Sequence, residues 1–153
     1  MAAKLKRAKP GDVLQLSTPK GFAYLQYAGR HQEYGDAVLV NPKISERPQA
    51  FTSKAFVGDY LIFYPAAAAV AQGLVVVIDH QPPPNIPWRL RRPGARSGRL
   101  VDTWIIEDGT SETVKSKLSE DDLSLPIAVI WNHELLAQRV LEGWNPLHEG
   151  REA

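Results

Sequence analysis

A long uncharged stretch limits what this chain can fold into more than any other feature. Residues 60 to 78 include no Asp, Glu, Lys or Arg, and most of them are apolar. A helix of roughly 20 apolar residues is long enough to cross a membrane. The stretch therefore allows two different structures: a membrane-spanning helix, or several short elements buried in the core of a water-soluble domain.

Pro65 and Gly73 divide the stretch and favour the second structure. Residues 60–64 are rich in strand-forming types, and residues 74–78 form an equally β-branched run. Pro at the start of a helix and Gly just past its end are a typical pair, so residues 66–72 are expected to form two helical turns. We predict a strand, a short helix and a strand, with no membrane span.

The composition is that of one ordinary globular domain. The chain has 153 residues, of which 44% are hydrophobic and 23% are charged. These proportions are close to average usage, and a chain of this length can bury a single core. We expect a disordered basic tail over residues 1–9, one globular domain over residues 10–147 and a C-terminal tail over residues 148–153.

The charge balance and the lack of cysteine bear on the partners and on the cellular compartment expected for this chain. The chain has 18 basic and 17 acidic residues, so any electrostatic attraction of nucleic acid or membrane must be local. Without cysteine there are no disulfides, thiolate metal sites or thiol nucleophiles, which is compatible with a reducing compartment. Residues 1–9 lack the apolar run of about 7 to 15 residues that a secretory signal needs. We therefore expect the cytoplasm.

Three Gly-Asp pairs each precede an apolar run, a pattern typical of a turn followed by a strand. The strands expected in this way are residues 13–16, 37–40 and 60–64. After a turn at residues 19–21, the aromatic-rich residues 22–27 can return as the second arm of a hairpin. A curled antiparallel sheet is expected to begin here.

Two segments are predicted to connect such elements. Residues 41–54 include two prolines and scattered charges, and are expected to be irregular. Residues 81–87 are too rich in proline for a helix or a central strand, which favours a stiff spacer. A polyproline ligand for an aromatic groove is the alternative for this segment.

The C-terminal third should form a hairpin and a helix. Residues 100–106 are expected to be a strand, followed by a turn around Asp108-Gly109 and a return arm at residues 113–115. Residues 119–124 are predicted to be an acidic loop, and residues 126–131 a short apolar run.

Asn132 can cap a helix over residues 133–142, and Gly143 can end it. Leu136 and Val140 lie four residues apart on that helix and should pack on the sheet. The tryptophans at 104, 131 and 144 are expected to anchor the core. The predicted class is α+β: a strongly curved antiparallel sheet or SH3-like partial barrel, with a short central helix and a C-terminal helix packed on it.

No motif for catalysis or for metal binding is complete. His133-Glu134 begins a zinc-binding helix pattern, but Ala137 stands where the second histidine is required. The four histidines are dispersed, and the common nucleophile-elbow and phosphate-binding patterns are missing. We therefore predict no catalytic residue, no metal and no cofactor, and a protein that is not an enzyme.

The most unusual local feature is a tryptophan followed by five arginines between residues 88 and 99. Guanidinium groups beside an aromatic ring suit recognition of phosphate or carboxylate. The alternative is a solvated hairpin tip whose arginines pair with nearby acidic loops. The acidic triplet Glu120-Asp121-Asp122 also has two interpretations, a solvated loop or a contact for a basic partner surface. The candidate partner-binding residues are Trp88, Arg89, Arg91, Arg92, Arg96, Arg99, Glu120, Asp121 and Asp122.

Several spaced segments together resemble family 26 of the immunity proteins found beside bacterial polymorphic toxins. The resemblance begins with Lys9-Pro10-Gly11-Asp12-Val13-Leu14 and Gly21-Phe22-Ala23-Tyr24-Leu25. It continues through the Pro- and Arg-rich stretch, Trp104-Ile105-Ile106-Glu107-Asp108-Gly109, and Glu142-Gly143-Trp144-Asn145-Pro146. It thus spans about residues 9 to 146.

The resemblance implies a small β-rich domain that neutralises a cognate toxin protein by stoichiometric binding, without a cofactor. It supplies no catalytic residues. With a net charge of +1, this chain is not the strongly acidic kind of inhibitor that occupies a basic nucleic-acid site. The competing function is a small SH3-like domain that binds nucleic acid through its arginine loop. A toxin ribonuclease on such a barrel is a third possibility.

Overall fold

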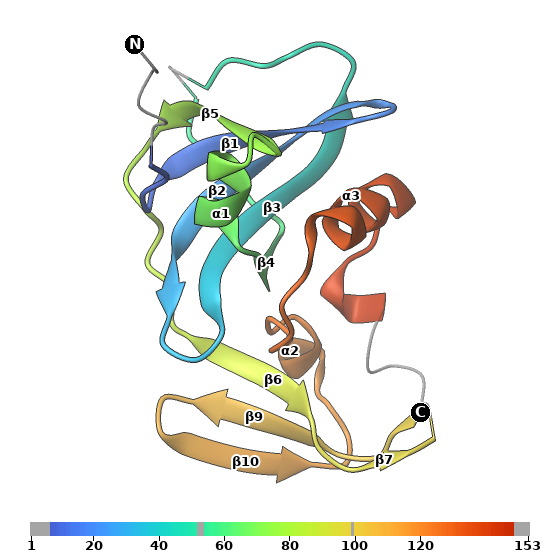
Figure 1. The fold of residues 1–153 in the computed structure, drawn as a ribbon. Helices are drawn as coiled ribbons and strands as arrows, with labels where there is room; N and C mark the ends of the chain where they lie inside the picture. Colours follow the sequence, from blue (N-terminus) through green and yellow to red (C-terminus); the bar gives the residue numbers. More distant parts are fainter. Residues whose placement is uncertain (1–6, 52–53, 99, 149–153) are drawn as a thin grey trace.

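The computed structural model describes residues 7–51, 54–98 and 100–148 of the chain. The predicted α+β class is confirmed: the strands form antiparallel sheets, with short helices packed against them. A sheet of five strands, the large sheet, and a sheet of three strands, the small sheet, make up most of the structure (Figure 1). The tail up to residue 6, Arg99 and residues 149–153 lie outside the described residues.

The large sheet has the strand order β4-β3-β2-β1-β5. Its first three strands follow one another in the sequence as a meander: β1 (Asp12–Thr18), β2 (Gly21–His31) and β3 (Gly35–Ser45). The predicted hairpin is confirmed, with Leu14 opposite Leu25. β3 is longer than expected because residues 41–45, predicted to be irregular, still run beside β2 after a register shift. Such a shift is a place where a strand tolerates a proline, here Pro42.

The uncharged stretch folds as predicted into β4 (Tyr60–Phe63), α1 (Ala66–Ala71) and β5 (Val75–His80). β4 and β5 lie at opposite edges of the large sheet, so α1 carries the chain from one edge to the other. Gly73 ends α1 with a φ of 74°, a backbone conformation that favours glycine. Within the described residues, no helix has both the length and the apolar character needed to span a membrane.

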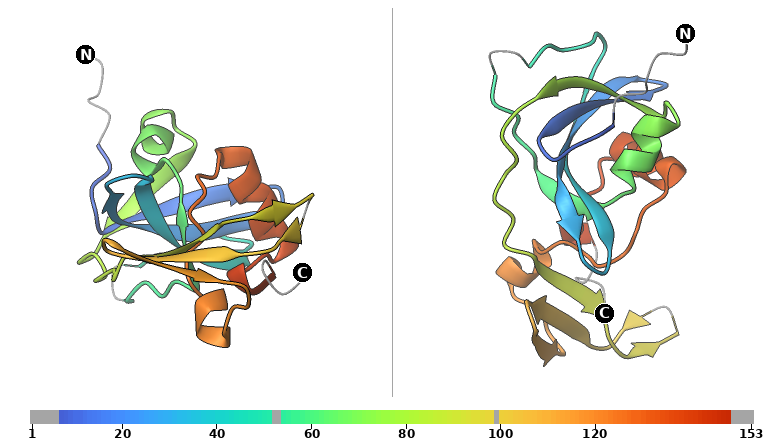
Figure 2. Two further views of the ribbon diagram at one scale, coloured as in Figure 1. Left: turned by 90° about the horizontal axis from the view of Figure 1, so that it is seen from below. Right: turned by 60° about the vertical axis from the view of Figure 1, so that its left-hand side comes forward.

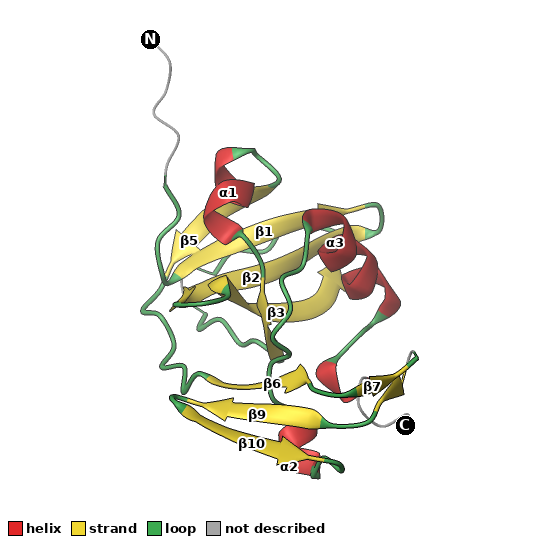
Figure 3. Ribbon diagram, turned by 60° about the horizontal axis from the view of Figure 1, so that its bottom comes forward, coloured by secondary structure: helices red, strands yellow, loops and turns green. Residues whose placement is uncertain are grey.

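Both faces of the large sheet are covered. On one face, α1 and α3 (His133–Glu142) lie over the strands (Figure 3). Leu136 and Val140 of α3 belong to the main apolar cluster, as predicted. On the other face, Phe51 packs against Tyr24 at one end of the sheet, and Leu90 of the small sheet packs against Phe63 at the other end. The large sheet is therefore a central layer of the molecule.

The predicted boundaries of α3 are confirmed. The Asn132 side chain accepts a hydrogen bond from the Leu135 N–H at 2.8 Å, and Gly143 is left-handed with a φ of 70°. Beyond the helix, the ring of Trp144 meets that of Trp131 edge-on, with centroids 4.8 Å apart. Trp131 and Trp104 are buried, as expected, whereas Trp144 is only half-buried.

The small sheet has the order β10-β9-β6, from β6 (Arg89–Pro93), β9 (Trp104–Asp108) and β10 (Ser111–Lys115). The predicted hairpin around Asp108-Gly109 is confirmed, and Trp104 lies on its central strand. The predicted strand over residues 100–106 is divided into β8 (Leu100–Val101) and β9. β8 pairs with β7 (Arg96–Ser97) in a short separate ribbon.

One segment, residues 126–131, joins the two sheets. Its first part runs parallel to β6, where the Arg91 N–H donates to the Pro126 carbonyl and the Ala128 N–H donates to the Arg91 carbonyl, each at 2.9 Å. Its last part runs beside β4, where the Trp131 N–H donates to the Phe63 carbonyl at 2.8 Å. The views in Figure 2 show the small sheet beyond the end of the large sheet where β2 turns into β3. By bonding to β6 and to β4, residues 126–131 fix the position of the small sheet relative to the large sheet.

Candidate binding cleft between the two sheets

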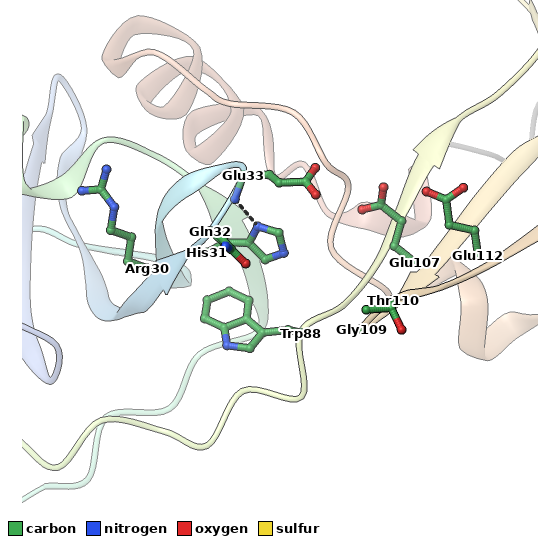
Figure 4. Close-up of a pocket in the computed structure, with 9 residues that line it drawn as sticks. All are labelled: Arg30, His31, Gln32, Glu33, Trp88, Glu107, Gly109, Thr110 and Glu112. Carbon is green, nitrogen blue, oxygen red and sulfur yellow. Dashed lines mark hydrogen bonds between the residues drawn. The ribbon is translucent and has the colours of Figure 1, made fainter.

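An open cleft of about 670 Å³ lies where the turn between β2 and β3 approaches the turn between β9 and β10. The segment that enters β6 forms its floor. Figure 4 shows the lining side chains, which come from three segments far apart in the sequence. The residues that line the cleft are Arg30, His31, Gln32, Glu33, Trp88, Glu107, Gly109, Thr110 and Glu112.

Trp88 is fixed on the floor by aromatic contacts. Its ring is stacked with that of buried Phe63 at 6.5 Å between centroids, and it meets the His31 ring edge-on at 5.4 Å. Its φ of 51° makes it the single non-glycine residue in the described parts of the chain with a positive φ. Such a conformation costs free energy, so packing of the ring must hold it. The partly exposed ring is thus a rigid surface.

The backbone of its own turn orients His31. Its Nδ1 accepts hydrogen bonds from the N–H groups of Glu33 at 3.0 Å and Tyr34 at 3.3 Å. An Nδ1 that accepts leaves the proton of a neutral imidazole on Nε2. That second nitrogen lies on the side of the gap that faces Glu107 (Figure 4). The imidazole therefore presents a donor to the cleft.

The opposite wall contains two carboxylates that share one cation. Glu107 accepts a hydrogen bond from the Arg92 Nε at 2.7 Å, and Glu112 accepts one from the Arg92 Nη2 at 3.2 Å. The Tyr34 hydroxyl donates to Glu107 at 3.2 and 3.3 Å. Burial, followed by the nearby charge of Glu107, raises the pKa of Tyr34. Tyr34 therefore remains a donor that keeps Glu107 in place.

Of the predicted binding residues, Trp88 lies in the cleft, whereas Arg91 has no exposed surface. The Arg91 guanidinium lies 4.5 Å from the centroid of the Trp104 ring. It also donates to the carbonyls of Leu123 at 3.3 Å and Pro146 at 2.7 Å. Arg91 therefore joins the small sheet to neighbouring segments and cannot touch a partner in this structure.

The other arginines do not form one site. Arg92 is paired with Glu107 and Glu112, and the Arg89 Nε lies 3.8 Å from a carboxylate oxygen of Asp108. Arg96 is exposed on β7, at the end of the small sheet away from the cleft (Figure 1). Arg99 lies outside the described residues. Residues 89–93 are thus a strand, β6, in which Arg89 and Arg92 pair with nearby carboxylates as the alternative expected, and Arg96 lies on the exposed β7–β8 ribbon.

The predicted acidic loop is instead a short helix, α2 (Glu120–Leu123). Asp122 is buried, accepts hydrogen bonds from Lys115 Nζ at 2.7 Å and from the Ser119 N–H at 3.0 Å, and completes a capping box with Ser119. Burial acts to raise the pKa of Asp122, but these hydrogen bonds outweigh it and lower the pKa to about 2. Glu120 and Asp121 remain exposed, so the triplet does not act as one charged patch.

Most cleft residues, including His31, Glu33 and Glu112, were not identified from the sequence. They are single polar residues in or beside turns, a type that is normally solvated, and only the fold brings them together. The one available signal was Trp88, a large aromatic residue directly after a proline-rich spacer.

A second, smaller hollow lies between α1 and α3. There the Tyr64 hydroxyl and the His133 Nδ1 are hydrogen-bonded to each other at 2.8 Å, and Asn132 caps α3. Burial raises the pKa of Tyr64 to about 12, so its hydroxyl stays protonated at neutral pH. The hydrogen bond joins the segment before α1 to the first turn of α3, so these groups have structural partners and the cleft is the stronger candidate for a site.

Over the described residues, no group of three or more His, Cys, Asp or Glu side chains is arranged to hold a metal ion. No family model, no curated protein and no solved structure matches this chain. The candidate function therefore depends on the geometry of the cleft and on the resemblance seen in the sequence.

Proposed function

We propose that this protein is a non-catalytic binding protein that captures a protein partner stoichiometrically, through the surface around the cleft. The partner we propose is a bacterial toxin encoded beside it, which the protein neutralises in the cytoplasm as an immunity protein. The observation that carries the binding proposal is the cleft itself. A fixed tryptophan ring and several carboxylates are held at the surface on rigid strands and short turns.

The strand next to the cleft supports a protein partner. Among the described strands, β10 pairs only with β9, so its other edge presents backbone N–H and C=O groups to a partner. The Val114 side chain on this strand is 66% exposed. Glu112, on the same strand, belongs to the cleft wall. An exposed edge, an exposed aliphatic side chain and the cleft thus form one continuous surface.

The arginines of β6 beside the cleft disfavour nucleic acid as its occupant. Phosphate binding needs basic side chains that are exposed and not already neutralised. Arg91 is buried, and Arg92 is paired with two carboxylates. The cleft wall nearest to them presents Glu107 and Glu112, which repel phosphate. Binding of generic RNA would therefore contradict the proposal.

The direct test is a titration calorimetry experiment with the purified product of the adjacent toxin-like gene. We expect one-to-one binding and loss of the toxin's activity. The variants Glu112→Lys and Val114→Asp change the proposed surface, and Glu46→Lys, at the far end of the β2–β3 hairpin, is the matched control. The two surface variants should weaken binding at least tenfold, while the control should bind normally.

Equal binding by all three variants would place the contact elsewhere. Binding of random RNA with an affinity that falls steeply as salt increases, together with no binding of the toxin, would overturn the proposal in favour of nucleic-acid recognition.

A further inference from the structure

We infer that the cleft binds a basic side chain, an arginine above all, presented by the protein partner. This inference rests on the proposed function and specifies the chemistry of its site. It follows from the charges around the cleft, from the aromatic floor and from the size of the opening.

The charges favour a cation. Glu33 lies on one side of the gap, and Glu107 and Glu112 lie on the other (Figure 4). Arg92 is the cation that pairs with two of these carboxylates. Arg30 also lines the cleft, but its guanidinium points away from the gap and lies 3.9 Å from Asp36. Three carboxylates around one guanidinium leave an excess of negative charge, which attracts a cationic group and repels an anionic one.

The floor is suited to a flat cation. The Trp88 ring is partly exposed and fixed by Phe63 and His31. A guanidinium is planar, stacks on aromatic faces and can donate two parallel hydrogen bonds to a carboxylate. A lysine ammonium makes the charge contact but not the planar one. An arginine therefore uses the ring and the carboxylates together.

The volume of the cleft agrees with an arginine side chain as its occupant. A volume of about 670 Å³ accommodates a long side chain together with neighbouring groups of the partner. The most firmly held carboxylate is Glu107, whose side chain is only 15% exposed, whereas the side chain of Glu112 is 57% exposed. A partner arginine would lie over Trp88 and donate to Glu112 and Glu33 near the opening.

The test uses the protein alone, so that its result does not depend on whether the toxin partner is correct. The probe is N-acetyl-arginine amide, followed by NMR through the indole N–H signal of Trp88, which the Trp88→Phe variant assigns. We expect a saturable shift with this probe in low salt. We expect a weaker effect with N-acetyl-lysine amide and none with N-acetyl-glutamate amide.

The Glu33→Gln/Glu112→Gln double variant should reduce affinity for the arginine probe by about twofold to fivefold, because exposed ion pairs are individually modest. Glu46→Gln is the control and should not change affinity. Both variants retain the shape of the side chains and leave Glu107 intact, so the Trp88 signal before titration should keep its position and report an intact floor.

No saturable shift with the arginine probe, or equal shifts with the glutamate probe, would overturn the inference. An unchanged affinity in the double variant would also overturn it. If the toxin is captured but the arginine probe leaves Trp88 unaffected, the binding function stands and its proposed chemistry fails. If the probe binds but no toxin is captured, the toxin assignment fails and the cation site stands.

Discussion

The large sheet buries mainly aliphatic and aromatic side chains on both faces, whereas the small sheet buries an arginine beside its few apolar side chains and has a set of ion pairs. In the large sheet, residues such as Leu14, Leu25 and Val38 are fully buried. In the small sheet, Arg91 is equally buried, and the side chains of β10 are mostly exposed. The difference shows that one chain can combine a largely apolar core with a smaller sheet that has more polar contacts.

The division also separates stability from binding. The cleft lies at the boundary, with its floor packed on Phe63 of the large sheet and its acidic wall formed by the small sheet. Exposed charged side chains can change there without disturbing the main core. We therefore expect substitutions in the cleft to alter binding and substitutions beneath either sheet to alter stability.

The largest effect should come from Trp104→Ala. This ring is buried and lies against the Arg91 guanidinium, so removing it leaves a cavity and an exposed edge of the cation. We expect a loss of about 3 to 5 kcal/mol in the free energy of unfolding, measured by urea titration. Fluorescence and circular dichroism should report the same transition, because residues 126–131 join the sheets. A loss below about 1 kcal/mol would show that the small sheet adds little to stability.

Arg91→Met tests how much the hydrogen bonds of the buried arginine contribute to stability. The variant removes the donors to the buried carbonyls of Leu123 and Pro146, and we expect a loss of about 1 to 3 kcal/mol. Arg92→Met, one position along the same strand, is the control and should lose less than about 1 kcal/mol because its ion pairs are partly exposed. An increase in stability on Arg91→Met, as seen for some buried charges, would show that apolar packing is sufficient here.

Asp122→Asn tests the second polar contact under the small sheet. The pKa of this carboxyl is lowered to about 2 in the folded protein, from an ordinary value of 3.8. A lowered pKa stabilises the fold above pH 3.8, and the contribution is lost as the pH falls toward 2. We expect the variant to be about 1 to 2 kcal/mol less stable at pH 7, with the difference shrinking between pH 4 and pH 2. A difference independent of pH would contradict this assignment.

The smallest of these effects should come from Asn132→Ala, on the large-sheet side. The variant removes the side chain that accepts the Leu135 N–H at the start of α3, which should cost about 1 kcal/mol. Gln138→Ala, on the exposed part of the same helix, should change stability by less than about 0.5 kcal/mol. Equal losses in the two variants would mean that the cap contributes nothing specific.

The two regions also differed in how well the sequence predicted them. In the large sheet, apolar runs between turn residues identified the strands, and Pro65, Gly73 and Asn132 marked the helices. In the small sheet, the pattern around Leu90 and Arg91 suggested solvent, because a fully buried arginine requires partners that only the tertiary structure supplies. Ser119 and Asp122 do have the spacing of a capping box, a signal for α2 that the acidic composition obscured.

The candidate site was the least predictable part. Trp88 is separated from Glu33 by four elements, β3 to β5, and by the proline-rich segment, and from Glu112 by β6 to β9, so no local pattern connects them. Their proximity follows from the way residues 126–131 place the small sheet beside the turn between β2 and β3. A site assembled from separate turns leaves no spacing motif in the sequence.

Amide hydrogen exchange on the protein with and without the adjacent toxin tests the central claim most directly. If the partner occupies the cleft and the edge of β10, residues 30–34 and 107–115 should exchange more slowly in the complex, while α1 and β5 should be unchanged. Protection confined to α1, β5 or the tip of the β7–β8 ribbon would contradict the claim and place the partner on another surface.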